Sequence, residues 1–362
     1  MRVLQIGSDR AQRGILFPGS AAFKRQEAYA EQFGALDVIG FSLRSDGAKE
    51  STSGALHIYP TNSVSKLSYM FDAVRIAKAR TKPEVVSAQD PFEVGLIGWL
   101  IARRLRVPLH VQVHTDFLSP EYARHSVLNR LRVFTAGFIL RRAARVRVVS
   151  ERVRESLEKE YHLRVPISVL PIFADLEHIR AAKPDTALVA RFADYGHRLL
   201  VVSRLESEKN VALALESFAQ SAPQDACLIV VGDGSERERL EAMAHELGIA
   251  ERISFEGSQD AAPYYSIADL VLVPSKYEGY GLVIIEALAA GKPVISTDVG
   301  VAREAGAIVT SPEAFVDALK DWFSRGPRTG ELKHYPYNNF EEYVHAYCDD
   351  IAACVGRQKS EY

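Results

Sequence analysis

The stretch that decides the fold is KYEGYGLVIIEALAAGKPVISTD, residues 276–298. It joins two short apolar runs, Leu270–Val273 and Val294–Ser296, through a segment of helical period at Gly281–Ala290. A strand, a helix and a second strand in this order form a right-handed crossover between parallel strands. The two glycines of its Gly-Tyr-Gly turn let the backbone bend tightly where the helix begins. The stretch therefore predicts a parallel sheet with a helix N-terminus near the strand ends.

The same alternation of strands and helices extends along the whole chain. Expected strands in the first half are Val3–Ile6, Leu36–Phe41, Leu56–Tyr59, Val85–Ala88, Leu109–Val113 and Val146–Val149, with helices at Ala21–Phe33, Ser65–Ala79, Phe92–Leu105 and Ser126–Ala144. In the second half the strands are Leu199–Val202, Cys227–Val231, Ile253–Phe255, Leu270–Val273, Val294–Ser296 and Ala307–Val309, with helices at Asn210–Gln220, Glu236–Leu247, Gly281–Ala290 and Pro312–Phe323. The pattern predicts two doubly wound α/β domains in tandem.

The domain limits follow from the less regular segment Leu170–Gly196, which carries Pro171 and Pro184. We expect an N-terminal domain at residues 1–180 and a C-terminal domain at 190–335. A last helix at about 341–355 is expected to pack back on the first domain. Open parallel sheets bind ligands beyond the carboxyl ends of their strands, so the chemistry should lie in the loops that follow strands.

Cations and backbone N–H groups meet in two such loops of the second domain. Arg204 and Lys209 follow the strand Leu199–Val202, and the N–H groups of Gly281, Leu282 and Val283 lie in the first turn of the predicted helix Gly281–Ala290. Together they suit an anion such as a diphosphate, which a helix N-terminus stabilises by about 0.3–1 kcal/mol when exposed. Taken alone, the segment 203–210 favours the alternative, an exposed turn with solvated charges.

Two glutamates accompany this turn. Glu278 precedes the predicted helix, and Glu286 lies inside it among Ile284, Ile285 and Leu288. A carboxylate in apolar surroundings needs a partner, and a ribose diol is a suitable one. The alternative for Glu286 is an exposed helical glutamate without a ligand.

Four motifs in this order resemble the donor-binding signature of the family 4 glycosyltransferases (glycosyl transferases group 1). They are Arg204 with Lys209, GDGSERERLE at 232–241, RISFEG at 252–257, and Glu278 with Glu286 around Gly-Tyr-Gly. The resemblance implies a GT-B fold, two facing Rossmann-like domains with a deep cleft between them, and transfer with retention of anomeric configuration.

The resemblance also implies residue functions. Arg204 and Lys209 would neutralise a nucleotide diphosphate, Glu286 would hold the ribose, and Glu278 would contact hydroxyls of the donor sugar. Phe255, Glu256 and Gly257 would border the base. No Asp-x-Asp pair follows a strand, so we expect no metal site and no cofactor other than the nucleotide sugar as co-substrate.

The first domain carries the expected acceptor side. His114 and Asp116 follow the strand LHVQV, and the resemblance places His114 beside the donor sugar, where it orients the sugar while the leaving phosphate takes the acceptor proton. Asp90 follows the strand Val85–Ala88 and either meets the acceptor or starts an Asp-Pro turn. Gly19, in the loop Gly7–Ser20, is a weaker match to a family glycine near the donor phosphates, since the usual paired glycines are absent.

Charge differs between the halves. Residues 1–180 carry 27 Lys+Arg and 18 Asp+Glu, and the remainder carries 17 and 28. Nine arginines fall between 124 and 154, with Leu128, Leu131, Phe134, Phe138 and Ile139 among the first of them. Either this segment contacts an anionic membrane leaflet, or its apolar stripe is a core face with arginines extended into solvent.

Composition excludes several classes of protein. The 362 residues are 47% hydrophobic and 25% charged, which is typical of a globular chain and not of a disordered one. The longest apolar run, 94–102, is too short to span a bilayer, and the three cysteines are too scattered for a disulfide framework or a zinc site. The N-terminus resembles a strand and not a signal peptide. We therefore expect a cytoplasmic protein, in contact with the inner face of the membrane if the arginines serve that purpose.

The resulting hypothesis is a hexosyltransferase, mannosyl or glucosyl, that acts on a glycan or lipid-linked acceptor in cell-envelope polysaccharide or glycolipid synthesis. No nucleic-acid partner is expected. The alternatives are a sugar-nucleotide epimerase or phosphorylase of the same fold, and a non-catalytic scaffold that binds nucleotide sugars. A dehydrogenase is disfavoured because no Gly-x-Gly-x-x-Gly follows the first strand.

Overall fold

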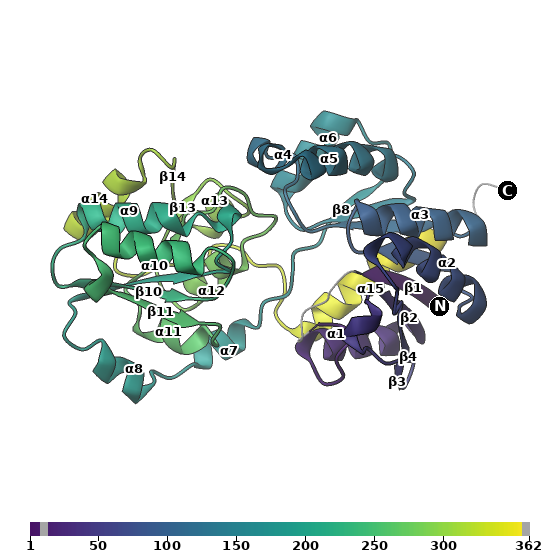
Figure 1. Cartoon of the computed structure of the whole chain (residues 1–362), viewed down its shortest axis with the longest axis horizontal. Coiled ribbons are helices and arrows are strands. Elements are labelled where there is room, and N and C mark those ends of the chain that lie inside the picture. Colours follow the sequence, from purple (N-terminus) through teal and green to yellow (C-terminus); the bar gives the residue numbers. More distant parts are fainter. Residues whose placement is uncertain (8–13, 357–362) are drawn as a thin grey trace. The chain divides into compact units, whose positions relative to one another are not determined.

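The computed structural model describes residues 1–7 and 14–356. They form two compact units. The first comprises Met1–Pro171 together with the chain from Tyr337 onward, and the second is Ile172–Pro336. Because the chain returns to the first unit, its C-terminal helix α15 (Phe340–Gly356) packs against α1 (Ala21–Phe33) and the central strands of that unit (Figure 1).

The first unit is built on a sheet of eight strands in the order β3-β4-β2-β1-β5-β6-β7-β8. All neighbouring strands are parallel except the edge pair β3 and β4. The strands are β1 (Arg2–Gly7), β2 (Ala35–Gly40), β3 (Ser51–Ser53), β4 (Leu56–Pro60), β5 (Val85–Ala88), β6 (Leu109–Val113), β7 (Arg145–Val148) and β8 (Ile167–Val169).

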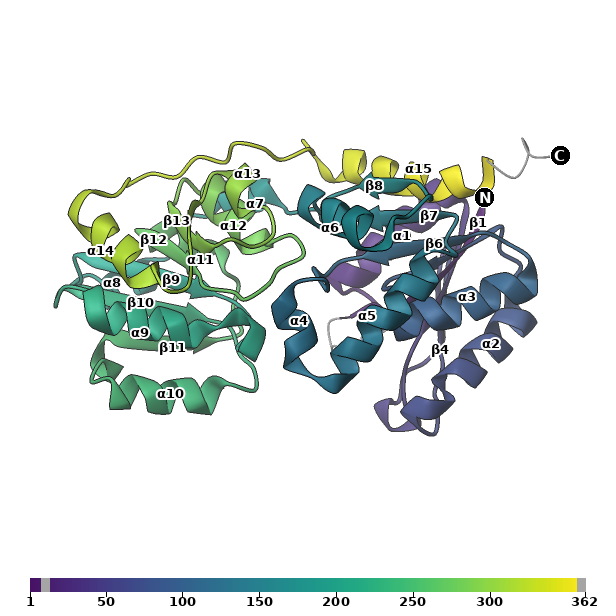
Figure 2. The same cartoon turned by 90° about the horizontal axis from the view of Figure 1, so that it is seen from above.

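Helices cover both faces of this sheet, as a parallel sheet requires. One face carries α2 (Tyr69–Arg80), α3 (Glu93–Leu105) and α5 (Val127–Leu140), which pack side by side (Figure 2). Gly98 of α3 lies so close to the sheet that a Cβ there would be 3.0 Å from that of Ala88. The remaining helices of the unit are α4 (Pro120–His125) and α6 (Glu151–Tyr161), and the short 3-10 turns are η1 (Arg44–Asp46) and η2 (Lys66–Ser68).

The opposite face, under α1 and α15, carries a row of buried polar side chains. Its members are Gln5, Ser87, His110, Gln112 and Arg147, each 2% exposed or less. The strand register places Ser87 beside His110 and Gln112 beside Arg147. The sequence showed this row as the alternation LHVQV and RVRV, which is unusual in strands buried on both faces.

Two arginines of the expected basic segment belong to this interior. Arg147 is buried within the row, and Arg145 forms an ion pair with Asp350 of α15. The prediction that all nine arginines lie on a solvated or membrane-facing surface is therefore wrong for these two. The polar groups of α15 draw them inward, because a buried guanidinium needs acceptors.

The second unit has a six-stranded parallel sheet in the order β11-β10-β9-β12-β13-β14. Its strands are β9 (His197–Val202), β10 (Ala226–Val231), β11 (Ile253–Gly257), β12 (Leu270–Val273), β13 (Val294–Thr297) and β14 (Ile308–Thr310). Its helices are α7 (Leu176–Ala181), α8 (Thr186–Arg191), α9 (Val211–Ser221), α10 (Arg237–Glu246), α11 (Ala262–Ile267), α12 (Leu282–Ala289), α13 (Ala302–Ala305) and α14 (Phe315–Arg325), with the 3-10 turns η3 (Ser207–Lys209) and η4 (Ala250–Arg252). Phe218, Phe315 and Trp322 fill the core under α9 and α14.

The structure differs from the sequence prediction mainly in short elements. Helices α4, α6, α7, α8, α11 and α13 and strands β3 and β8 were not expected. Helix α6 has eleven residues and the others have three to six, so few apolar positions are present to reveal a period. The segment 170–196, expected as a connection without a long strand, contains α7 and α8.

The ion pair between Asp350 and Arg145 gives a testable contribution to stability. Burial alone would raise the pKa of Asp350, but the hydrogen bonds from His110 and Arg145 lower it to about 2. We expect Asp350→Asn to reduce the stability of the first unit by about 3 kcal/mol at pH 7. Because the pKa of Asp350 is depressed on folding, the difference should persist above about pH 4 and close as the pH falls toward 2.

The measurement is urea unfolding, monitored by the fluorescence of Trp99. Because the chain has two tryptophans, Trp322→Phe is used as the background so that only Trp99 contributes to the signal. Asp349→Asn is the matched control, because Asp349 is exposed on the same helix. An equal loss in both variants would contradict the prediction.

Candidate functional site

In the second unit, two loops that follow neighbouring strands are tied together. The loop after β9 contains Arg204 and Lys209, and the loop after β12 contains Glu278. Strands β9 and β12 pair directly, and the N–H of Lys276 donates to the carbonyl of Glu208 over 2.8 Å. The sequence motifs at 203–210 and 276–298 are therefore one structural feature at the carboxyl edge of the sheet.

Lys209 and Glu278 form the centre of this feature. The Lys209 Nζ donates to Glu278 Oε1 over 2.6 Å, and each side chain is 17% exposed. The hydroxyl of Ser275 donates to the same oxygen over 2.8 Å. Arg204 is more exposed and pairs with Glu208 at 2.9 Å. Lys209 is thus held in place by Glu278, while Arg204 is paired with Glu208 near solvent.

The N-terminus of α12 lies directly after Glu278. Gly281 caps the helix in the left-handed conformation, with a φ of 92°, which a glycine adopts without strain. Within the part of the chain that the structure describes, the N–H groups of Gly281, Leu282 and Val283 donate to no protein group. The backbone here is also crowded, since a Cβ on Gly300 would lie 2.1 Å from the carbonyl oxygen of Tyr280.

Glu286 has a partner inside the protein. The hydroxyl of Tyr265, a fully buried residue of α11, donates to Glu286 Oε2 over 2.9 Å. Burial raises the pKa of Glu286, and the bond from Tyr265 opposes that rise. Glu286 is therefore not an exposed helical glutamate. Its second oxygen, Oε1, accepts from no side chain among the described residues.

The residues expected to border a base lie on β11, at the far side of β10 from β9. Glu256 accepts hydrogen bonds from Ser254, Arg191 and Tyr264. Burial alone would raise the pKa of Glu256, but these three bonds lower it. Gly257 has a φ of 70° and its carbonyl accepts from Gly232, while Phe255 stacks under Arg237 at 6.0 Å. All three residues therefore have partners within the protein, and the Glu256 carboxylate already accepts hydrogen bonds from three side chains.

In the first unit, His114 follows β6 and is half-buried. Its Nε2 lies 3.1 Å from the carboxamide oxygen of Gln112. Burial lowers the pKa of His114 to about 3, and the positive charges of Arg147 and Arg25 act in the same direction. The imidazole is therefore neutral at physiological pH, so it serves as a hydrogen-bonding group and not as a cation.

The two aspartates of this unit lie after neighbouring strands. Asp90 Oδ1 accepts from the N–H of Phe92 over 2.7 Å, which is the turn that an Asp-Pro pair favours. Burial raises the pKa of Asp90 to about 6. Burial also raises the pKa of Asp116, and the charge of Arg152 opposes it.

Gly19 has a φ of 84° just before Ser20, which caps α1 by accepting from the N–H of Phe23. Much of the predicted loop Gly7–Ser20, residues 8–13, lies outside the described residues.

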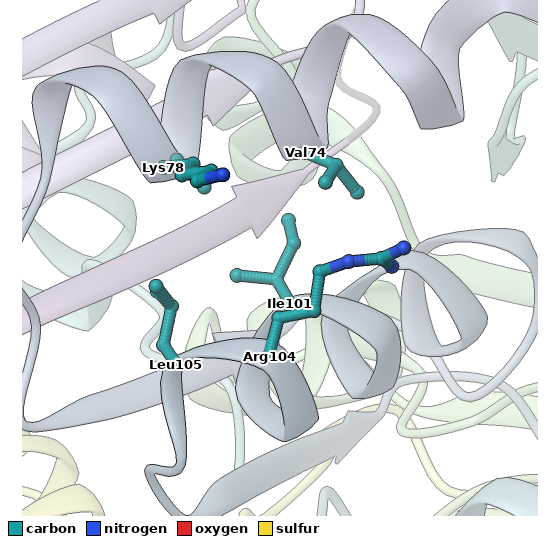
Figure 3. Close-up of a pocket in the computed structure, with 6 residues that line it drawn as sticks. Val74, Lys78, Ile101, Arg104 and Leu105 are labelled. Atoms are coloured by element: carbon teal, nitrogen blue, oxygen red, sulfur yellow. The ribbon is translucent and has the colours of Figure 1, made fainter.

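A separate hollow of about 490 Å³ lies between α2 and α3 (Figure 3). It is lined by Val74, Ala77, Lys78, Ile101, Arg104 and Leu105. All of these residues except Val74, which lies near the middle of α2, belong to the C-terminal halves of the two helices. Crossover helices run antiparallel to the strands, so the hollow lies toward the amino edge of the sheet. It is therefore distinct from the loops that hold His114 and Asp90.

Among residues 1–7 and 14–356, no group of three or more His, Cys, Asp or Glu side chains could hold a metal ion. Nor does any helix in these ranges have the length and apolar character needed to cross a membrane.

Comparison with family models covers both units. Residues 191–339 match the model of glycosyl transferases group 1, and residues 29–178 match that of glycosyltransferase family 4. The chain belongs to this glycosyltransferase family. The match to the first model includes every residue discussed above in the loops of β9 and β12.

Curated relatives are similar over part of their length. The chain is 30% identical over 243 residues to an alpha-monoglucosyldiacylglycerol synthase of Streptococcus pneumoniae, covering 62% of this chain and 54% of the relative. It is 34% identical over 220 residues to a 2-deoxystreptamine glucosyltransferase of Streptomyces kanamyceticus, covering 57% and 56%. The chain thus matches about half the length of these relatives.

Solved structures match the whole fold. HepE of Anabaena, solved with UDP and glucose, has a TM-score of 0.70 at 19% identity, covering 100% of this chain and 98% of that one. Sucrose-phosphate synthase of Thermosynechococcus elongatus has a TM-score of 0.73 at 22% identity, covering 99% and 98%. These likenesses confirm the GT-B architecture of two Rossmann-like domains that the sequence predicted.

Several residues at the site were missed from the sequence. Ser275 and Tyr265 hold the two glutamates, and Glu208 holds Arg204. A serine and a tyrosine in apolar runs carry no pattern of their own, and only their contacts reveal them. Gln112 and Arg147 were missed as well, although their polar positions in the strands LHVQV and RVRV are a signal that could have revealed them.

The cation pair makes a testable prediction about ligand discrimination. We expect Lys209→Ala and Arg204→Ala to weaken binding of a nucleoside diphosphate by roughly tenfold or more, because a charge-assisted hydrogen bond contributes about 1.5–3 kcal/mol. Binding of the nucleoside alone should change little. Calorimetric titration of UDP, GDP and the two nucleosides measures both.

Arg325→Ala is the control, since Arg325 is an exposed arginine of α14 paired with Asp321. Equal losses for diphosphate and nucleoside would indicate that Lys209 and Arg204 act through the fold instead.

Proposed function

We propose that this protein transfers a hexosyl group from a nucleotide-diphosphate sugar to a glycan or lipid-linked acceptor, with retention of anomeric configuration. Residues 190–335 bind the donor and residues 1–180 receive the acceptor. The observation that carries the proposal is the cluster of Lys209, Glu278 and Ser275 beside the N-terminus of α12. We place the reaction in cell-envelope polysaccharide or glycolipid synthesis.

In this proposal the diphosphate is bound by protein groups alone. Arg204 and Lys209 supply two positive charges, and Gly281, Leu282 and Val283 supply N–H donors at the positive end of a helix dipole. Negative charge grows on the diphosphate as the glycosidic bond breaks. Preorganised donors at that position stabilise the transition state without a metal ion.

The remaining polar groups are assigned to the sugar and the nucleoside. Oε1 of Glu286 accepts from the ribose hydroxyls, while Tyr265 holds Oε2. Glu278 Oε2 faces hydroxyls of the donor sugar, since its Oε1 is occupied by Lys209 and Ser275. Phe255, Glu256 and Gly257 border the base. In the first unit, neutral His114 orients the sugar, Asp90 and Asp116 meet the acceptor, and Gly19 approaches the phosphates.

The comparisons favour a glucosyl donor over a mannosyl one. Both curated relatives described above are named for glucosyl products or transfer, and HepE was solved with UDP and glucose. We therefore propose a UDP-hexose as the donor. The named lipid product of the first relative also supports a lipid acceptor.

A panel of nucleotide sugars tests the proposal. We expect one donor, UDP-glucose first, to raise the melting temperature of the protein, since a ligand at 100 times its Kd adds about 2.7 kcal/mol of stability. With an acceptor present, donor turnover should persist in excess chelator, and the product should keep the anomeric configuration of the donor by NMR.

Three other outcomes of these assays would contradict parts of the proposed function. Complete loss in chelator, restored by manganese or magnesium, would contradict metal-independent catalysis. Turnover of donor without acceptor, or a need for free phosphate, would indicate an epimerase or a phosphorylase. Donor binding without any turnover would indicate a scaffold.

The acceptor side carries an unusual surface on α5. Val127, Leu128, Leu131 and Phe134 are each more than 50% exposed, although large apolar side chains are normally buried. The exposed cations Arg124 and Arg130 lie beside them. Exposed apolar residues flanked by cations are typical of a helix that lies in the surface of an anionic bilayer. This observation favours the membrane alternative over a core face, to which Ile139 and Leu140 contribute instead.

The membrane proposal predicts that the protein sediments with vesicles containing anionic lipid and that salt weakens this binding. Leu131→Ser with Phe134→Ser should abolish sedimentation, because the apolar insertion is lost. Replacing Arg130, Arg132, Arg141 and Arg142 by glutamine should do the same, since each basic residue near such a surface contributes about 1 kcal/mol. Donor binding should be unchanged in both variants.

Arg239→Gln with Arg325→Gln, exposed in the second unit, is the charge control. A wild type that ignores anionic vesicles at low salt would end the membrane proposal without affecting the donor site.

A further inference from the structure

The side chain of Gln112 makes four hydrogen bonds in the interior of the first unit. Its Nε2 donates to the hydroxyls of Ser87 and Tyr347, over 3.0 Å and 2.8 Å. Its Oε1 lies 3.1 Å from both Arg147 Nη1 and His114 Nε2. No hydrogen-bonding capacity of the amide is left over, so its position is fixed from two sides.

Arg147 determines which way this amide faces. A guanidinium only donates hydrogen bonds, so the atom of Gln112 that meets it must be the oxygen. The same oxygen meets His114 Nε2, and an amide oxygen only accepts. The His114 nitrogen must therefore carry the proton. In the neutral ring this leaves Nδ1 as the hydrogen-bond acceptor.

The groups behind Gln112 are themselves held firmly. Arg147 donates to the carbonyls of Leu170 and Pro171, and lies over the ring of Tyr347 at 5.0 Å. The hydroxyl of Tyr347 in turn donates to Gln5 Oε1 over 3.0 Å. Helix α15 thus supports the amide from one side and β7 supports it from the other.

The surroundings also oppose protonation of His114. Burial lowers the pKa of His114 to about 3, and the neighbouring groups act in the same direction. The charged and titratable groups that face His114 are Arg147 on β7, Arg25 on α1 and His110 on β6. No carboxylate is among them. Among the described residues, His114 Nδ1 has no protein partner.

We propose that Gln112 and Arg147 are positioning residues that fix His114 as the neutral Nε2–H tautomer, so that Nδ1 accepts a hydrogen bond from a hydroxyl of the donor sugar. The sugar contact rests on the proposed function, whereas the tautomer does not. The residues act in series, because Arg147 orients the amide and the amide orients the ring.

NMR of ¹⁵N-histidine-labelled protein without ligand tests the tautomer directly. The chain has ten histidines, and His114→Asn assigns the signal of His114. In the wild type we expect Nε2 to be protonated and Nδ1 unprotonated from pH 6 to 8. Gln112→Met should give a mixture of tautomers. Gln112→Glu should keep the proton on Nε2 and raise the pKa of His114 by the added negative charge.

Gln26→Met is the matched control. Gln26 is a buried amide of the same face, bonded to Gln5, without contact to His114. It should cost similar stability and leave the tautomer unchanged. Protonation at Nδ1 in the wild type, an unchanged tautomer in Gln112→Met, or the same change in Gln26→Met would overturn the proposal.

Kinetics tests the contact with the sugar. Gln112→Met should lower kcat by about tenfold, equivalent to one lost hydrogen bond, with little change in the KM of the acceptor. Gln112→Glu, measured at high pH where His114 is neutral, should recover most of that loss. A changed tautomer with unchanged turnover would overturn the sugar contact alone, and a wild type that binds no nucleotide sugar would overturn the proposed function instead.

Discussion

The structure of the first unit depends on a guanidinium buried in the middle of a sheet. Arg147 is 2% exposed, and an unpaired charge in such a place would cost several kcal/mol. Its acceptors are carbonyls of the segment that leaves the unit, a glutamine on the neighbouring strand and the electron-rich rings of α15. One charge therefore contacts the sheet, the exit of the chain and the C-terminal helix, and its burial depends on all three. His114 follows the same strand as Gln112 and is held in position by its contact with that glutamine.

The second unit carries its cations at the carboxyl edge of its sheet, where each is paired with a carboxylate. Lys209 is held by Glu278, which is in turn held by Ser275, while Arg204 stays near solvent with Glu208. An anion that binds here meets cations already in place, so little side-chain entropy is lost on binding.

Strong periodicity explains what the sequence predicted well. The runs around β9, β10, β12 and α12 are long and apolar, so the tandem α/β architecture and the loops after the strands could be read directly. The partners of the site residues could not, because Tyr265 reaches Glu286 from a separate six-residue helix. The arginines of 124–154 were predicted as one surface, but the sheet register turns Arg145 and Arg147 inward. Contacts between distant segments, such as Gln112 with Tyr347, leave only a polar residue in an apolar strand as their signal.

The return of α15 to the first unit makes the second unit an insertion between parts of the first. His110 bonds to a residue 240 positions later in the chain. During synthesis the second unit is therefore complete before the first has all of its core. At about 5–20 residues per second, the polar row lacks its cover by α15 for on the order of ten to thirty seconds after residue 171 is made. Buried charges are well suited to that interval, because water can solvate an exposed Arg147 or His110, whereas an equally large apolar face would promote aggregation until α15 arrived.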